Sequence, residues 1–249
     1  MFKFRVRENS YGHKKRLDFI VKQIEKYCFA NSLNQKEIRI LDVGCGSGLL
    51  VTLPLGSLGY NILGIDFDEN SIKFANTQNI FREVRFEKGM IESINDKYDI
   101  ILVCEVLEHV EKPIEFLNTV KSKLKSNGII VLTAPNGYGW SEREASFVGW
   151  LYKNGILKIV LNKLKGHSQD ITMNESDEHL QKFSNSSIID IFEKSNLTIA
   201  IRSNGPVFGG PIVERTWAKL PGFKMLSNWL GDILPPNLVL VWYFVLKNS

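Results

Sequence analysis

The residues best suited to chemistry follow a short apolar run near position 40. Asp42 lies in the run ILDV, and Gly44, Gly46 and Gly48 come next at alternate positions before a helical pattern begins. Glycine permits a sharp turn and lets the backbone approach a ligand where a Cβ atom would collide. A dinucleotide fingerprint needs another glycine three residues after Gly46, where this chain has Leu49. NAD is therefore the weaker candidate for this loop.

A second acid stands at the end of the next apolar run. Asp66 closes NILGID and lies 20 residues beyond Gly46. A carboxylate at this place can accept hydrogen bonds from both hydroxyls of an adenosine ribose. A glycine-rich turn and a helix-capping aspartate would explain each feature alone, but the strand, the spacing and the acid together favour a cofactor site.

An acidic turn provides a third candidate site. Glu105, Glu108 and His109 stand at positions i, i+3 and i+4, which share one face of a helical turn. With His179 they would offer oxygen and nitrogen ligands to Mg²⁺, Mn²⁺ or Zn²⁺, and a bound cation would lower the pKa of an acceptor hydroxyl. In the alternative, His109 caps the turn or acts as a general base, and Glu105 is the second catalytic residue.

Three stretches of the chain resemble the class I S-adenosylmethionine-dependent methyltransferases over residues 36–136. They are ILDVGCGSGLL with Asp66 after it, KYDIILVCEVLEHV, and LKSNGIIVLTAPN. The E-x-x-E-H turn, together with H-x-x-K-F at His179, is similar to the ubiquinone-pathway O-methyltransferases and, more distantly, to small-RNA terminal ribose methyltransferases. The resemblance implies S-adenosylmethionine as the cofactor.

The resemblance also implies roles for single residues. The glycine loop would face the methionine part of the cofactor, Asp66 would hold the ribose, and Phe67 would flank the adenine on one side, with Met90 and Ile91 on the other. The full set that the resemblance places around the cofactor is Asp42, Gly44, Cys45, Gly46, Gly48, Asp66, Phe67, Met90, Ile91 and Cys104.

Strands and helices alternate along the chain and would position these residues. Short β-branched runs predict strands at 38–43, 61–66, 84–88, 99–104, 128–134, 197–202 and 238–246, with helical patterns between them. One such pattern, KPIEFLNTVKSKLKSNG, has Pro113 near its start and Asn127-Gly128 as its stop. This rhythm predicts an α/β fold, a Rossmann-like three-layer sandwich with a mostly parallel seven-stranded sheet. The resemblance implies that the last strand lies antiparallel beside the fifth.

We expect a single domain over 1–249. A helical cap at 1–35 precedes the cofactor-binding half at 36–136, and insertions at 137–180 and 203–237 would cap the acceptor side of the active site with helices. The second insertion is rich in Gly, Pro and Trp. Its aromatic residues would wall an acceptor pocket or close the core.

Composition limits the setting of the protein. The 249 residues are 44% apolar with a net charge of +4, and the three cysteines form no C-x-x-C pair, which favours a reducing compartment. No apolar stretch reaches the length of a membrane span, so we expect a soluble, cytoplasmic protein. Residues 146–165 form an amphipathic, basic helical pattern that would pack on the domain, close over the acceptor, or touch an anionic membrane peripherally.

These features predict O-methylation of a small-molecule hydroxyl, such as a catechol, a diol, an isoprenoid phenol or a sugar-like acceptor. The N-x-x-P-P-Y-like motif of amino-group nucleic-acid methyltransferases is absent after the fourth strand. Two alternatives stay open. One is RNA ribose 2′-O-methylation, suggested by the basic amino-terminal residues, and the other is a regulatory partner that binds the cofactor without catalysis.

Overall fold

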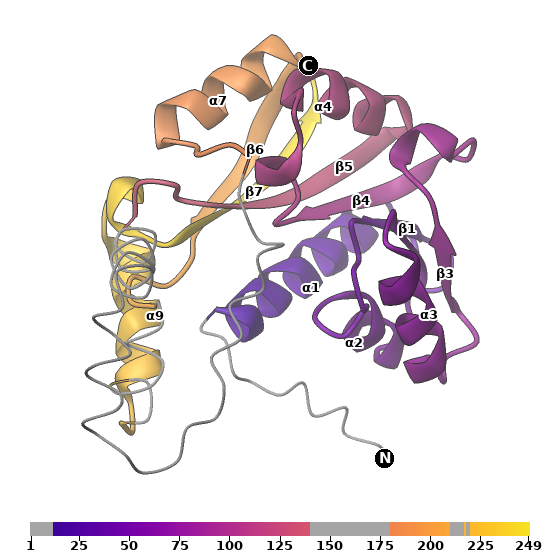
Figure 1. Cartoon of the computed structure of the whole chain (residues 1–249), viewed down its shortest axis with the longest axis horizontal. Helices are drawn as coiled ribbons and strands as arrows, with labels where there is room; N and C mark the ends of the chain where they lie inside the picture. The colour runs from indigo at the N-terminus through magenta and orange to yellow at the C-terminus, as the bar shows by residue number, and fades with distance from the viewer. Residues whose placement is uncertain (1–11, 140–179, 210–216, 218–219) are drawn as a thin grey trace, which may run out of the picture.

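A seven-stranded sheet forms the centre of the molecule (Figure 1). The computed structural model describes residues 12–139, 180–209, 217 and 220–249. The strand order is β3-β2-β1-β4-β5-β7-β6, and β1 to β5 are parallel while β7 runs antiparallel to both β5 and β6. The strands are β1 (Arg39–Val43), β2 (Asn61–Asp66), β3 (Val84–Lys88), β4 (Tyr98–Cys104), β5 (Leu124–Pro135), β6 (Leu197–Asn204) and β7 (Val241–Asn248). The predicted fold class is confirmed, including an antiparallel strand beside the fifth.

Helices cover the sheet on both faces (Figure 1). The α-helices are α1 (His13–Ala30), α2 (Thr52–Ser57), α3 (Glu69–Gln78), α4 (Pro113–Ser122), α7 (Asn185–Lys194) and α9 (Phe223–Ile233). Short 3₁₀ helices in the described ranges include η1 (Ile91–Ser93), η2 (Leu107–His109) and η4 (Pro236–Leu238). Since α9 falls between 203 and 237, the second expected insertion does contain a helix.

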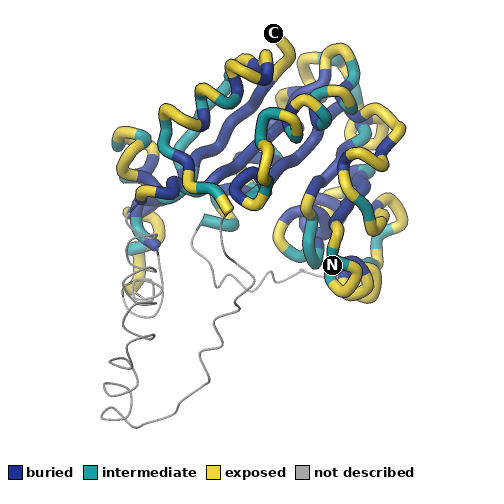
Figure 2. The backbone as a smooth tube through the Cα atoms, turned by 45° about the horizontal axis from the view of Figure 1, so that its top comes forward, coloured by how far each residue is buried: buried dark blue, intermediate teal, exposed yellow. Residues whose placement is uncertain are grey.

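Alternation along the strands divides the core into two layers, because successive side chains point to opposite faces of a sheet. Ile40 packs in a cluster with Ile20 and Ile24 of α1, whereas Leu41 packs in a cluster with Leu117 of α4 and Phe192 of α7. Figure 2 shows the strands as a buried centre beneath helices that are exposed on their outer sides. This three-layer packing holds the carboxyl ends of the parallel strands in fixed positions.

The helix expected to stop at Asn127-Gly128 ends earlier, at Ser122, and β5 already begins at Leu124. The pairing of β4 with β5 shifts register between Tyr98 and Ile100, which marks a bulge. A Cβ on Gly128 would lie 3.1 Å from the carbonyl oxygen of Asp99. The Asn-Gly pair is therefore part of an irregular strand and does not terminate the helix.

None of the helices in the described part of the chain is both long and apolar enough to cross a membrane. The predicted amphipathic helix at 146–165 and most of the first insertion lie outside the described residues, so that prediction stays open.

Candidate active site

The candidate residues gather at one edge of the sheet. β1 lies between β2 and β4, so the direction in which strands are added reverses there, and open α/β sheets bind ligands outside the carboxyl ends of strands at such a point. Asp42 and Gly44 occur at the carboxyl end of β1, Asp66 ends β2, and Glu105 follows β4. Residues from three predicted sites are thus brought to the same edge.

The three loop glycines are needed for different reasons. Gly44, Gly46 and Gly48 all adopt left-handed backbone conformations, with φ of 68°, 53° and 70°. A Cβ on Gly44 would lie 2.6 Å from Val106, and one on Gly48 would lie 2.5 Å from Phe86, whereas one on Gly46 would meet no heavy atom within 4 Å. Of these three glycines, Gly46 alone faces open space. The loop therefore provides one backbone position where a ligand can approach closely.

The Asp66 carboxylate links the glycine loop after β1 to the turn after β2. One carboxylate oxygen accepts a hydrogen bond from the backbone N–H of Gly46 at 2.8 Å, and the other accepts one from the N–H of Asp68 at 2.9 Å. Each carboxylate oxygen has a second lone pair, so both can still accept hydrogen bonds from ribose hydroxyls. The acceptor oxygens of Asp66 and the open side of Gly46 fit an adenosine cofactor.

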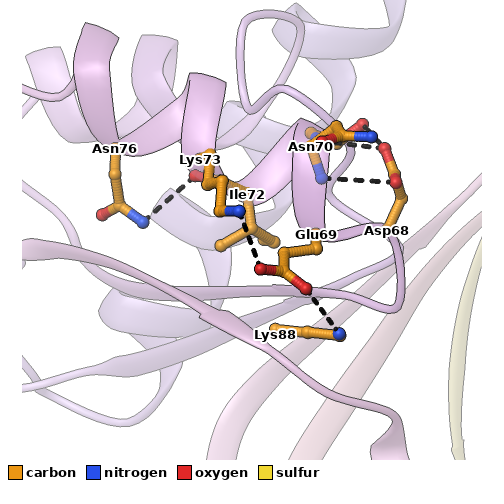
Figure 3. A network of polar contacts seen from close by, with 8 residues as sticks. Asp68, Glu69, Asn70, Ile72, Lys73, Asn76 and Lys88 are labelled. Atoms are coloured by element: carbon orange, nitrogen blue, oxygen red, sulfur yellow. Dashed lines mark hydrogen bonds and ion pairs between the residues drawn. The ribbon is translucent and has the colours of Figure 1, made fainter.

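The turn after β2 is fixed by the first residues of α3 (Figure 3). The Asp68 carboxylate caps the helix by accepting hydrogen bonds from the N–H groups of Asn70 and Ser71. Glu69 forms ion pairs with Lys73 and with Lys88 of β3. These contacts tie the start of α3 to β3 and hold the Asp66 turn in place.

Asp42 is a buried acid at the end of β1. The hydroxyl of Thr52 donates a hydrogen bond to it at 2.6 Å. Burial raises the pKa of Asp42 to about 6, although the Thr52 bond and the positive charge of Arg16 oppose this rise. Burial also raises the pKa of Cys45, and that of Cys104 to about 12, so both thiols stay protonated at neutral pH.

Arg16 is a site residue that the sequence analysis missed. Its guanidinium is nearly buried, and one of its nitrogens lies 3.8 Å from a carboxylate oxygen of Glu105. Another nitrogen lies 2.8 Å from Nδ1 of His13, whose pKa falls to about 4 because of burial and the charge of Arg16. The neutral imidazole can therefore accept a hydrogen bond from Arg16. In the sequence, Arg16 is one of several basic residues near the amino terminus, and no local pattern separates it from solvated lysines.

The acidic turn does not have the geometry that the sequence predicts. Glu105 adopts a left-handed conformation with φ of 56°, and the helical turn that follows is a 3₁₀ turn limited to Leu107–His109. The Thr133 hydroxyl donates to Glu105 at 2.8 Å, whereas Glu108 is buried and His109 is exposed. The expectation that these residues share one face of a helix is wrong, because Glu105 lies outside the turn and is held by strand β5.

The predicted four-ligand metal site is not assembled by its described members. Among the described residues, no group of three or more His, Cys, Asp or Glu side chains is arranged to hold a metal ion. His179 lies outside those residues, although the nearby Gln181 donates its backbone N–H to the carbonyl oxygen of Glu108 at 3.0 Å. The segment after His179 thus lies beside the acidic turn, and the role of His179 stays a prediction.

The residues expected around the adenine differ in their exposure. Phe67 and Met90 expose most of their side chains beyond the ends of β2 and β3. Ile91 packs into the main core cluster instead. Of the Met90-Ile91 pair, only Met90 therefore offers its side chain to a ligand.

A family model for a methyltransferase domain matches residues 13–200. The chain belongs to this family. The match covers α1, all the parallel strands from β1 to β5, and the turns that carry Asp42, Asp66 and Glu105. The chain thus carries a methyltransferase domain, the kind of domain that the glycine loop and Asp66 predict.

Curated relatives of this methyltransferase include the ubiquinone biosynthesis O-methyltransferases of Rickettsia felis and Rickettsia bellii. Each is 34% identical to the chain, over 148 and 150 residues respectively. The matched stretch covers 56% of this chain and 59% and 60% of those relatives. The methyltransferase therefore spans about three fifths of the length of the curated relatives it matches.

Solved structures support the fold of the methyltransferase. One such structure is magnesium protoporphyrin IX methyltransferase from Synechocystis, solved with bound SAH. It matches with a TM-score of 0.58 at 16% identity, and the match covers 96% of this chain and 84% of the Synechocystis chain. An S-adenosylmethionine-dependent methyltransferase from Clostridium acetobutylicum has a TM-score of 0.58 at 14% identity, with 95% and 92% covered. Both likenesses extend past residue 200, where β7 completes the sheet.

Proposed function

We propose that this methyltransferase transfers the methyl group of S-adenosylmethionine to a hydroxyl oxygen of a small molecule. The observation that carries the proposal is the name shared by the curated relatives, ubiquinone biosynthesis O-methyltransferase, at 30–34% identity. The acid that follows β4 is consistent with it, since Glu105 lies at the same edge of the sheet as the glycine loop.

The bound cofactor supplies an electrophilic methyl group on a sulfonium. The backbone at Gly46 admits the ligand, Asp66 accepts hydrogen bonds from its ribose, and the buried cation of Arg16 is suited to pair with its carboxylate. These contacts fix the direction of the methyl group. Positioning of this kind contributes about 7–11 kcal/mol in favourable systems.

With the cofactor bound, an acceptor hydroxyl held opposite the methyl group would take that group and displace S-adenosylhomocysteine. The hydroxyl proton must go to a base. Glu105 is suited to this task because Thr133 and Arg16 hold its carboxylate in one orientation. His109 is the second candidate, since it is exposed at the end of the 3₁₀ turn that follows Glu105. General-base assistance contributes about 10²–10⁴-fold to such steps.

A divalent cation at Glu105, Glu108, His109 and His179 would replace this base by acidifying the hydroxyl. The described residues lend that hypothesis no support. We therefore propose transfer by positioning and a side-chain base, with the cation as the alternative that chelation tests.

A screen of acceptors tests the proposal. Catechols, vicinal diols, isoprenoid phenols and sugars are incubated with the protein and S-adenosylmethionine, and S-adenosylhomocysteine is measured. Turnover with hydroxyl acceptors is expected, and Asp66→Ala is the control because it should weaken cofactor binding and so lower turnover at limiting S-adenosylmethionine. Tight cofactor binding without turnover on any acceptor would favour the non-catalytic partner, and turnover on RNA alone would favour ribose methylation.

A further inference from the structure

Arg16 is held by a hydrogen bond within its own helix. Its nitrogen Nη2 lies 2.8 Å from Nδ1 of His13, three residues earlier in the first turn of α1. A guanidinium has five N–H donors and no acceptor, so the ring nitrogen must accept this bond. Burial and the charge of Arg16 lower the pKa of His13 to about 4, which leaves the ring neutral at neutral pH. His13 therefore carries its proton on Nε2 and presents Nδ1 to Arg16.

Arg16 lies at the edge of the sheet that carries the glycine loop. Its nitrogen Nη1 is 3.8 Å from Glu105, which follows β4, and its charge acts on Asp42 beside the loop. The Arg16 side chain is 9% exposed, and charge-assisted hydrogen bonds are strong where water is largely excluded. An anionic group of a ligand at this edge would therefore gain from pairing with Arg16.

A neutral partner orients the guanidinium without cancelling its charge. His13 uses one of the five N–H groups of Arg16, so others can serve a ligand. An acid at position 13 would also accept this bond, but its charge would compete with a ligand carboxylate for the cation. A lysine there could accept no bond at all. Of these choices, the neutral imidazole fixes the side chain and leaves its charge available.

The turn that carries this pair is anchored to the last elements of the chain. The hydroxyl of Tyr243 in β7 donates to the carbonyl oxygen of Gly12, the N-cap of α1, at 3.5 Å. Lys15 donates to the carbonyl oxygen of Asn228 in α9 at 2.9 Å. Because both ends of the turn are tied down, a side chain that it carries can be held in a defined direction.

We propose that His13 is a positioning residue for cofactor binding, which holds the Arg16 guanidinium in the orientation that pairs with the carboxylate of the cofactor's methionine part. The inference rests on the proposed function, in which Arg16 meets that carboxylate. His13 acts through Arg16 alone, and the role needs a side chain that accepts a hydrogen bond and carries no charge.

Calorimetry with two ligands tests this role. S-adenosylhomocysteine carries the carboxylate, whereas 5′-methylthioadenosine has the same nucleoside and thioether without the amino-acid part. His13→Ala should bind S-adenosylhomocysteine about three- to tenfold more weakly, because the hydrogen bond that orients the cation is lost. The affinity of this variant for 5′-methylthioadenosine should be unchanged.

Two variants of equal shape separate orientation from charge. Asparagine and aspartate at position 13 both offer an oxygen to Arg16, but only aspartate is charged. His13→Asn should bind both ligands as the unchanged protein does, whereas His13→Asp should bind S-adenosylhomocysteine about tenfold more weakly or worse. The control is Lys14→Ala, since Lys14 is exposed on the same turn and pairs with Asp18. Both affinities should stay the same in this control.

Thermal unfolding verifies that each variant is folded. Unchanged S-adenosylhomocysteine affinity in His13→Ala would overturn the proposal, and so would equal affinities in His13→Asn and His13→Asp. An equal loss for both ligands would overturn it too, because the pair would then serve only the stability of α1. Absence of S-adenosylhomocysteine binding by the unchanged protein would overturn the proposed function as well, whereas the other outcomes leave that function standing.

Discussion

Gly46 allows cofactor binding to be separated from folding by a single methyl group. Its φ of 53° imposes a backbone penalty of about 1–2 kcal/mol on alanine, but the new Cβ would meet no protein atom within 4 Å. We expect Gly46→Ala to fold, with a melting temperature lower by about 2–8 °C. The Cβ would occupy space that the cofactor needs, and overpacking of about 1–3 kcal/mol corresponds to binding that is weaker by a factor of about 5 to 150.

Two other glycines provide matched controls for Gly46→Ala. Gly59 has a φ of 90° and an equally open Cβ position, but it precedes β2 at the opposite edge of the sheet, so Gly59→Ala should also have a backbone penalty but leave the affinity unchanged. Gly48→Ala should unfold most easily, because its Cβ would lie 2.5 Å from Phe86. Calorimetry with S-adenosylhomocysteine and thermal unfolding measure the two effects. Normal affinity in Gly46→Ala would refute the assignment of the open side of the loop to the cofactor.

Three further predictions concern the acids of the site. Asp66→Asn should weaken S-adenosylhomocysteine binding by about 1.5–3 kcal/mol through loss of charged acceptors, as measured by calorimetry. The pKa of Asp42 is about 6 in the folded protein and about 4 in the unfolded chain, so the folded state binds this proton more tightly. The free energy of unfolding should therefore fall by on the order of 2–3 kcal/mol as pH rises from about 4 to 6. Chemical denaturation across that range should lose this dependence in Asp42→Asn. Glu105→Gln should slow methyl transfer by about a hundredfold with cofactor affinity unchanged, and excess chelator should leave the rate unaltered. Inhibition by chelator alone would instead favour the four-ligand metal site.

The strands of the sheet could be predicted from the sequence because burial on both faces selects continuous β-branched runs. The placement of Asn127-Gly128 within β5 could not be predicted from the sequence, because an Asn-Gly pair is compatible with both a helix end and an irregular strand. Only the pairing of Leu124 with Tyr98 of β4 decides between these possibilities. The orientation of α9 could not be predicted from the local sequence either. Nothing in the residue pattern indicates that Gly231 packs against the backbone at Gly205.

The local geometry of the glycine loop and of Asp66 could be predicted because these residues lie in short turns directly after strands. That of the acidic turn could not, since helical spacing assumes a regular backbone and Glu105 leaves it with a positive φ. Arg16 comes from a helix 26 residues before Asp42, and tertiary packing alone brings its charge to Glu105. Long-range contacts of this kind leave no trace in residue spacing.

The place of β7 in the sheet has a consequence for synthesis of the chain. β7 is translated after all the other strands, yet it pairs with β5 on one side and supplies the sheet partner of β6 on the other. A nascent chain that ends before residue 241 therefore carries two unpaired strand edges, which are prone to association with other chains. Until residues 241–248 leave the ribosome, β6 has no hydrogen-bonded neighbour among the described strands of the sheet, and only the packing of α7 joins it to the sheet that carries the glycine loop.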